Sequence, residues 1–402
     1  MKTREVKLGE VANVKGGKRI PKGIGLINIP NGHPYIRVRD LNNKRLLELD
    51  NSYEYVDNET QKVISKYTVK TGDVVLSIVG TIGLVAIVGR TLDGANLTEN
   101  CVKLSSFHGV NRDFLYYYLR SDCGQQEIRC GTVGAVQAKL PIKNIQNIAI
   151  NLPDYTTQER IASLLLSIDR KIELNQKIND NLEQQAVALF KSWFVDFSLF
   201  GGTVPGNWED TTLENITTLI TRGIAPKYSD NSDQTVVNQK CIRNHTIDLS
   251  LARTHTPKAI NEKWLKFGDL LINSTGDGTL GRVAQVWFAP KALTVDSHVT
   301  IVRPAREELI FYIGLWGILH EKEIESLHTG STGQTELPRD RVKMLKLLLP
   351  DNISLSRFNS IITPMASTII SNQEENQKLA SLRDTLLPKL MSGEIDVSNI
   401  QF

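Results

Sequence analysis

The first half of the 402-residue chain contains a pattern that returns about 197 positions later. Gly72–Val75 reads Gly-Asp-Val-Val, and Gly268–Leu271 reads Gly-Asp-Leu-Leu. The other repeated strings are Gly80-Thr81-Ile82-Gly83 with Gly278-Thr279-Leu280-Gly281, Leu152-Pro153-Asp154 with Leu349-Pro350-Asp351, and Asn175-Gln176 with Asn372-Gln373. A repeat of this size predicts two related domains of roughly 150 residues, each large enough to bury its own core. Proteins with approximate two-fold symmetry suit two-part targets, of which duplex DNA is the commonest.

Composition excludes several classes of protein. Apolar residues make up 41% and charged residues 23% of the chain, as in globular proteins. No apolar run approaches the ~18 residues of a membrane span, and the N-terminus lacks the apolar region of a signal peptide. The four cysteines, none in a Cys-x-x-Cys pair, are Cys101, Cys123, Cys130 and Cys241. We therefore expect reduced thiols in a cytoplasmic protein that does not associate with membranes.

The pattern of apolar residues predicts an α+β protein in four segments. Residues 1–155 and 201–352 contain short alternating runs broken by Gly, Asn and Asp, which is typical of β-rich domains. A short helix is expected at 112–120 within the first of them. Residues 156–200 and 353–402 contain apolar residues at helical spacing, with Thr156 or Thr157 as the expected cap of the first helix.

Both long helices carry a heptad seam with a polar interruption. Apolar residues recur at alternating steps of four and three over positions 161–193 and again over 358–390. Pro364 is expected to kink the second helix or to mark its start. The interruptions are asparagines at matching places, namely Asn175, Asn179, Asn372 and Asn376. Because a buried Asn must meet another polar group, we expect the helices to pack with these pairs juxtaposed, in either direction.

Motifs that could support catalysis are weak. Residues 276–281 match Gly-x-Gly-x-x-Gly, but a strand-like run follows where a dinucleotide site needs a helix. The pattern favours a tight hairpin instead. Asp154, Asp169 and Lys171 resemble a nuclease set only superficially, because the last two fall on the predicted helix. The sequence contains no P-loop, no zinc-type Cys/His spacing and no Asn-Pro-Pro-Tyr-type methylation motif, so we expect no catalytic site.

Several strings resemble the specificity subunits of type I restriction-modification enzymes. Leu152–Ala162 (LPDYTTQERIA), Ile168–Asn175 (IDRKIELN) and Ala188–Phe197 (ALFKSWFVDF) resemble the central conserved region of that family. Leu382–Ile395 (LRDTLLPKLMSGEI) resembles its distal conserved region. The strings occur in the family's order, and the duplicated layout spans the whole chain.

This resemblance implies a detailed organisation. Residues 1–155 and 201–352 would be target-recognition domains in a pseudo-two-fold arrangement, each reading one half of a bipartite site in double-stranded DNA. Residues 156–200 and 353–402 would form an antiparallel coiled coil that sets the spacing of the halves. The coiled coil would dock two methyltransferase (modification) subunits, which restriction/translocase subunits then join. S-adenosylmethionine, ATP and magnesium would belong to those partners, leaving this chain with no cofactor, no metal and no catalytic role.

Candidate DNA-binding residues are basic, amide or hydroxyl side chains in predicted loops. The net charge is only +3, but residues 1–45 hold eleven Lys and Arg against three acids. In the first domain the candidates are Lys15, Lys18, Arg19 and Lys22 in the Gly16-Gly17 loop, Arg37 and Arg39 on the strand expected to follow, Thr81 at an expected hairpin tip, and Thr132, Gln137 and Lys139 in a second glycine-bearing loop. In the second they are Arg222, Lys227, Arg243, Asn244, Thr279, Arg282, Ser331, Thr332 and Gln334. Lys, Ser and Thr would mostly hold phosphate, whereas Arg, Asn and Gln can read base edges.

Three alternatives remain open at this stage. Trp193, Phe194 and Phe197 at the end of the first helix are candidates for binding a partner subunit, but they could equally pack on the chain's own domains. A stand-alone DNA-binding regulator with two recognition domains would show the same duplication. An adaptor that displays two ligand modules on a coiled coil would also show it, without salt-dependent binding to DNA.

Overall fold

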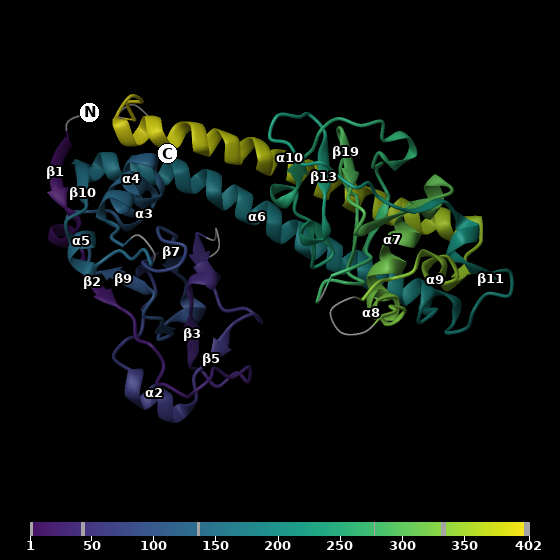
Figure 1. Cartoon of the computed structure of the whole chain (residues 1–402), viewed down its shortest axis with the longest axis horizontal. Coiled ribbons are helices and arrows are strands. Elements are labelled where there is room, and N and C mark those ends of the chain that lie inside the picture. Colours follow the sequence, from purple (N-terminus) through teal and green to yellow (C-terminus); the bar gives the residue numbers. More distant parts are fainter. Residues whose placement is uncertain (1–2, 42–44, 135–136, 277, 331–334, 398–402) are drawn as a thin grey trace. The chain divides into compact units, whose positions relative to one another are not determined.

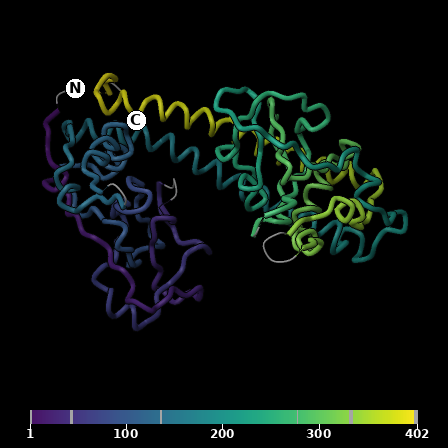
Figure 2. The backbone as a smooth tube through the Cα atoms, in the orientation of Figure 1, coloured from purple at the N-terminus to yellow at the C-terminus, as the bar shows by residue number. Residues whose placement is uncertain are grey.

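The computed structural model describes residues 3–41, 45–134, 137–276, 278–330 and 335–397 (Figure 1). The chain divides into two compact units. The first unit comprises residues 1–173 and 377–402, and the second comprises residues 174–376. Figure 2 follows the backbone from the first unit along helix α6 (Tyr155–Phe194) into the second, and back along helix α10 (Asn352–Ser392). The unit boundaries therefore fall inside the two long helices, and each unit contains one part of each helix.

The first unit is built on a five-stranded sheet of order β2-β9-β6-β7-β4, beside a three-stranded sheet β5-β3-β8 and the pair β1-β10. The strands are β1 Thr3–Lys7, β2 Asn13–Gly16, β3 Pro34–Ile36, β4 Leu46–Leu47, β5 Glu54–Tyr55, β6 Val74–Ser77, β7 Val85–Val88, β8 Asn96–Leu97, β9 Cys101–Ser105 and β10 Ala149–Pro153. The helices are α1 Leu8–Val11, η1 Val38–Leu41, α2 Asn58–Ile64, η2 Arg90–Leu92, α3 Arg112–Arg120, α4 Asp122–Gly131 and α5 Ile142–Gln146. The expected helix at 112–120 is confirmed as α3.

The second unit repeats this plan with a four-stranded sheet of order β12-β20-β17-β18, a three-stranded sheet β16-β13-β19, and the pairs β11-β21 and β14-β15. The strands are β11 Glu209–Thr212, β12 Thr217–Arg222, β13 Thr235–Val237, β14 Ile242–Arg243, β15 Thr246–Ile247, β16 Arg253–Thr254, β17 Leu270–Asn273, β18 Val283–Gln285, β19 Leu293–Val295, β20 Val299–Pro304 and β21 Lys346–Leu349. The helices are η3 Ser198–Phe200, η4 Leu213–Ile216, η5 Gln239–Cys241, η6 Leu249–Leu251, η7 Asn261–Lys263, η8 Glu307–Leu309, α7 Ile310–Leu319, α8 Glu321–Ser326 and α9 Arg339–Lys343. The α+β class is confirmed.

The repeated Gly-Asp pair makes the same turn in both units. Gly72 and Gly268 have φ angles of +86° and +88°, a backbone conformation that favours glycine. The carboxylate that follows is buried, and it accepts a hydrogen bond from the backbone N–H three residues earlier. Each turn leads into the central strand of its sheet, β6 or β17. The repeated Gly-Asp string therefore corresponds to the same turn before the same strand of the two sheets.

Aspartates start both long helices. Asp154 accepts hydrogen bonds from the backbone N–H and the hydroxyl of Thr157, so Asp154 is the N-cap and the expected cap at Thr156 or Thr157 was wrong. Asp351 caps α10 in the same way through Ser354. Pro364 lies inside α10 and does not mark its start, because the helix begins at Asn352.

Within the second unit, α6 and α10 are antiparallel and joined by the central asparagines. Asn175 donates from Nδ2 to Oδ1 of Asn376 at 3.0 Å and to a carboxylate oxygen of Glu375 at 2.7 Å. Asn372 donates from Nδ2 to Oδ1 of Asn179 at 2.8 Å. Across these contacts, residue numbers rise along α6 as they fall along α10. The contacts therefore define both the antiparallel direction and the register of the two helices. The predicted juxtaposition of the four asparagines is confirmed.

Within the first unit the same two helices are held by a buried ion pair. Arg383 of α10 lies 2.9 Å from a carboxylate oxygen of Asp169 on α6, whose other oxygen accepts the hydroxyl of Tyr117 at 2.7 Å. Apolar residues on either side complete the packing, among them Ile161 and Leu390. The role of Asp169 is therefore structural, which explains its position on a helix without reference to a nuclease site.

We predict that replacing only one member of an asparagine pair destabilises the second unit. Asn179→Leu leaves Nδ2 of Asn372 without its acceptor, and this should cost about 1–3 kcal/mol, whereas Asn179→Leu with Asn372→Leu should be nearly neutral or stabilising. Urea denaturation of the single, double and exposed control Gln184→Leu variants measures this. Additive losses in the double variant would contradict a direct pair.

The cap of α10 gives a second prediction. Burial would raise the pKa of the Asp351 carboxyl, but hydrogen bonds from Ser354, Trp208 and Ile353 outweigh it and lower the pKa from 3.8 to about 2. The stabilisation is thus fully present above pH 3.8 and is lost as the pH falls towards 2. Asp351→Ala should cost about 1 kcal/mol near neutral pH and progressively less in acid, while Asp351→Asn should retain most of the cap. Equal stability of the alanine variant and the wild type at pH 7 would contradict this role.

Candidate nucleic-acid interface

In each unit, a glycine fixes the start of the loop that follows the first strand of the main sheet, β2 or β12. A Cβ atom on Gly17 would lie 2.0 Å from the carbonyl oxygen of Thr98, and one on Gly223 would lie 1.9 Å from that of Val295. Neither position can accept a side chain without moving the backbone. The two glycines are therefore structural equivalents. Each fixes the start of a loop that carries predicted DNA-binding residues.

In the first unit, two further loops emerge at the same edge of the sheet. Strands β2 and β6 are both antiparallel to β9, so both end at this edge. Thr81 is exposed in the turn between β6 and β7, as predicted for a hairpin tip. A bridge between Val79 and Lys139 brings the second glycine-bearing loop beside that turn. That loop contains Thr132, whose hydroxyl donates to the carbonyl oxygen of Ile128, and the exposed side chains Gln137 and Lys139.

The second unit has the same arrangement. Strands β12 and β17 are both antiparallel to β20, and the turn after β17 leads into β18. This confirms that the Gly-x-Gly-x-x-Gly string is a hairpin connection. A bridge between Thr275 and Glu336 brings the later loop beside it. Arg222, at the end of β12, donates to the carbonyl oxygen of Leu337 and forms an ion pair with Glu336 at 2.7 Å.

The remaining candidates of the second unit lie as follows. Thr279 is half-buried in the turn, and its hydroxyl is within 3.4 Å of the carbonyl oxygens of Thr275 and Gly276. Arg282 is half-buried at the end of the same turn, and Lys227 is exposed in the loop after Gly223. Three candidates lie outside the described residues, namely Ser331, Thr332 and Gln334.

A tight hairpin displays Arg243 and Asn244. Asn244 and His245 form the two-residue turn between β14 and β15, with φ angles of +52° and +61°. Nε2 of His245 lies 3.4 Å from a carboxylate oxygen of Glu321, which also accepts the backbone N–H of Val283. Burial would raise the pKa of Glu321, but these contacts outweigh it and lower the pKa below its ordinary value. The hairpin is thus anchored at its tip, and the Arg243 side chain beside it is exposed.

Three arginines of the first unit are engaged by carboxylates. Arg37 and Arg39 both form ion pairs with Glu54, the second at 2.6 Å, and Arg19 lies 3.5 Å from Glu99. Arg37 follows β3 and Arg39 lies in the short helix η1, so the expectation that both lie on a strand was wrong. Reading a base with either arginine would require it to leave Glu54.

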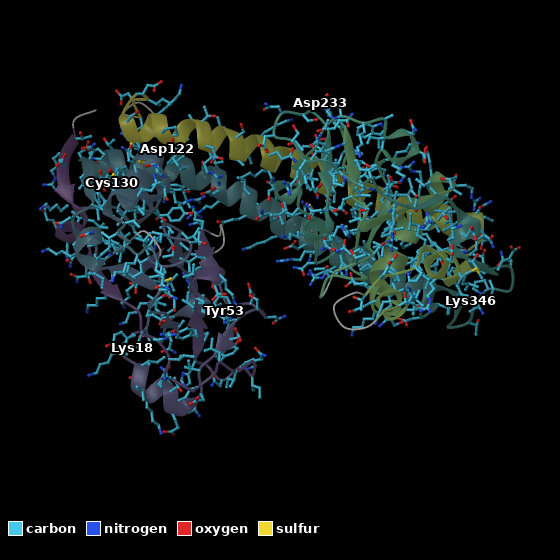
Figure 3. The ribbon with its side chains drawn as sticks, in the orientation of Figure 1. Lys18, Tyr53, Asp122, Cys130, Asp233 and Lys346 are labelled. Atoms are coloured by element: carbon cyan, nitrogen blue, oxygen red, sulfur yellow. The ribbon has the colours of Figure 1, made fainter. Side chains whose placement is uncertain are left out.

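The candidate lysines near the start of the first unit are exposed. Lys15 lies on β2, and Lys18 and Lys22 follow in the loop after Gly17. Figure 3 shows the side chain of Lys18 at the surface of the unit. The structure adds Lys66, which sequence reasoning missed because it comes from a separate segment after α2. Only the fold brings that segment to the loop.

The aromatic residues at the end of α6 belong to the core of the second unit. Trp193 and Phe194 are buried, and both rings lie against Phe358 of α10. The Phe197 ring packs edge-on against Trp208. This corrects the expectation of a partner-binding surface at Trp193, Phe194 and Phe197, because their rings are used in packing the domain on its own helices.

The described residues contain no group of three or more side chains that could hold a metal ion. In the same part of the chain, no helix is both long enough and apolar enough to cross a membrane.

Several known proteins resemble this chain in sequence or in fold. Residues 2–184 match the family model of the type I restriction modification DNA specificity domain. The chain is 25% identical over 393 residues to the MjaIX specificity subunit of Methanocaldococcus jannaschii, covering 91% of this chain and 88% of that protein. It is 22% identical to the HindI specificity subunit of Haemophilus influenzae, covering 67% of this chain and 73% of that one. The fold resembles the crystal structure of the type I S subunit from M. genitalium, with a TM-score of 0.54, 16% identity, and 97% and 99% of the two chains covered. Residues 2–184 therefore match the type I restriction modification DNA specificity domain, and the chain is similar over most of its length to type I specificity subunits.

Proposed function

We propose that the chain recognises a bipartite DNA target, with one half-site read by each unit. The observation that carries this proposal is the repeated presentation of loops. In each unit, a glycine-anchored loop and a β-hairpin turn leave the same edge of the sheet, and a later loop is bridged to that turn. An edge of irregular loops on a rigid sheet can differ in sequence between the units without changing the fold. The two edges can therefore read two different half-sites.

The side chains at these edges fall into two groups, those suited to phosphate contacts and those suited to base contacts. Exposed lysines and the hydroxyl of Thr81 suit phosphate contacts, which position a protein on duplex DNA without reading its sequence. Exposed Arg243 and Asn244 at a stiff hairpin tip suit base contacts in a groove, where a bidentate pair discriminates by ~1–3 kcal/mol. We therefore assign base recognition in the second half-site to this hairpin before any other loop of the unit.

The chain is assigned a non-catalytic role, in which it directs two methyltransferase (modification) subunits and the restriction/translocase subunits to the target. Chemistry that needs S-adenosylmethionine, ATP or magnesium is assigned to those subunits. The support is the similarity of the chain to type I specificity subunits, together with apolar residues that remain exposed on the two long helices. Leu174 and Ile178 of α6 are exposed apolar residues in the second unit, and Leu382 of α10 is exposed in the first.

Co-expression with the methyltransferase subunit of the same system tests this function. We expect a complex of one specificity chain with two methyltransferase chains by light scattering. Sequencing of host DNA should then show methylation at a single motif split by an unread spacer. A chain that binds one DNA site tightly without any partner would instead support a stand-alone regulator.

A substitution in one unit should affect one half-site. Arg243→Ala should reduce discrimination at one or two base pairs of the second half-site by ~1–3 kcal/mol each and leave the first half-site unchanged. Competition binding with single-base-pair variants of the target measures it. The control is Arg357→Ala, an exposed arginine on α10 of the same unit. An equal loss on every sequence would show that Arg243 contacts phosphate and does not read bases.

A further inference from the structure

A solvent-open cavity of about 240 Å³ lies between strands β2 and β9 of the first unit and the segment after α2. Three lysines line it, Lys15, Lys66 and Lys103, together with Tyr67. They come from three separate segments, so the cavity is a product of the fold and not of one basic run in the sequence. We call this set the lysine pocket.

Two of these lysines lie beside each other on neighbouring strands of the sheet. Lys15 and Lys103 are direct partners in the antiparallel register of β2 and β9. Like charges in that position destabilise a sheet unless a counter-charge compensates them. Lys103 is compensated, since its Nζ lies 3.3 Å from Asp73 and donates to the carbonyl oxygen of Thr68. Among the described residues, no carboxylate forms an ion pair with Lys15.

Lys66 and Lys18 add to this positive charge. Neither has an ion-pair partner among the residues that the structure describes. Nζ of Lys18 lies 5.5 Å from the centre of the Tyr67 ring, a cation–π contact that holds this side chain beside the pocket. Of the three lysines that line the pocket, only Lys103 is paired with a carboxylate, so the ammonium groups of Lys15 and Lys66 have no ion-pair partner among the described residues.

Lys15 and Lys66 differ in this respect from three arginines of the same unit. Arg19, Arg37 and Arg39 are each paired with a carboxylate of the same unit. The lysine pocket thus gathers ammonium groups without ion-pair partners from separate segments into one small space, which favours the binding of an anion there.

The equivalent strand pair of the second unit carries no lysine at the matching positions. Strand β12 corresponds to β2 and β20 to β9, because Gly17 and Gly223 make the same close approach at the ends of β2 and β12. The residues paired at the place of Lys15 and Lys103 are Thr221 and Ile301. The adjacent pair Lys15 and Lys103 is therefore a feature of the first unit and not of the duplicated plan.

We propose that the lysine pocket binds one phosphate group of the DNA backbone beside the first half-site. This proposal rests on the proposed function. The ammonium groups of Lys15 and Lys66 hold the phosphate, and Lys103, fixed by Asp73, forms the floor of the site. Because a phosphate contact carries no sequence information, the pocket sets the position of the duplex and supplies affinity to every sequence alike. The two halves of the subunit thus contribute unequally to salt-dependent binding.

The test uses the complex of the full chain with its methyltransferase subunits. Lys15→Gln with Lys66→Gln is compared with the wild type and with Lys62→Gln, an exposed lysine on α2 of the same unit. Dissociation constants are measured from about 50 to about 200 mM NaCl for the cognate duplex and a shuffled duplex. We expect the double variant to lose roughly 0.9 from the slope of log K against log salt, as for one phosphate. The ratio of affinities for the two duplexes should stay unchanged, as should the melting temperature of the complex.

Three results would overturn the assignment. An unchanged salt slope in the double variant, with specific binding intact, would show that no DNA phosphate occupies the pocket. A changed ratio between cognate and shuffled duplexes would show that the lysines read bases. Loss of inorganic phosphate binding, measured by calorimetry, with an unchanged DNA slope would assign the pocket to a free phosphate. If the wild-type complex itself binds no duplex specifically, the proposed function fails, which is a separate outcome.

Discussion

The antiparallel pairing of α6 and α10 is the constraint on which the rest of the structure depends. In the second unit the helices meet through asparagine side chains that can satisfy each other in only one register, since Asn175 contacts Asn376 and Asn179 contacts Asn372. An apolar seam would tolerate a shift by a heptad, whereas a shifted asparagine would face apolar side chains at a cost. In each unit, the β-rich domain packs on the segments of the two helices that belong to that unit.

Different kinds of contact join the β-rich domains of the two units to the helices, although the two domains share one fold plan. In the second unit the contact is an aromatic cluster, with Phe190 and Phe194 of α6 against Phe358 of α10 and Tyr312 of α7. In the first unit a buried polar set takes that role, with Asp169 between Arg383 and Tyr117, and Arg45 paired with Glu173. The aromatic contact tolerates small displacements, whereas the ion pairs demand one geometry. The two units therefore share one fold plan, although the contacts that join each domain to its helix segments differ in how much displacement they tolerate.

Prediction from the sequence succeeded where the signal was local or periodic. The helix at 112–120 and the asparagine pairs both follow from spacing that the chain displays directly. It failed where two segments distant in sequence decide the outcome. Trp193 is buried because Phe358 arrives from the other end of the chain, and Arg39 is occupied because Glu54 lies opposite it. Lys66 could not be assigned to a site, because only the packing of its segment against β2 and β9 creates one.

The pairing of β1 with β10, and of β11 with β21, has a consequence for how such a chain can change. The strand that opens each unit is hydrogen-bonded along its length to the strand that closes it, immediately before a long helix begins. Entry and exit of the intervening chain thus lie side by side. Recombination at these two places exchanges a complete folded insert while leaving the helices untouched, so new combinations of half-sites can arise by cassette exchange without redesign of the scaffold.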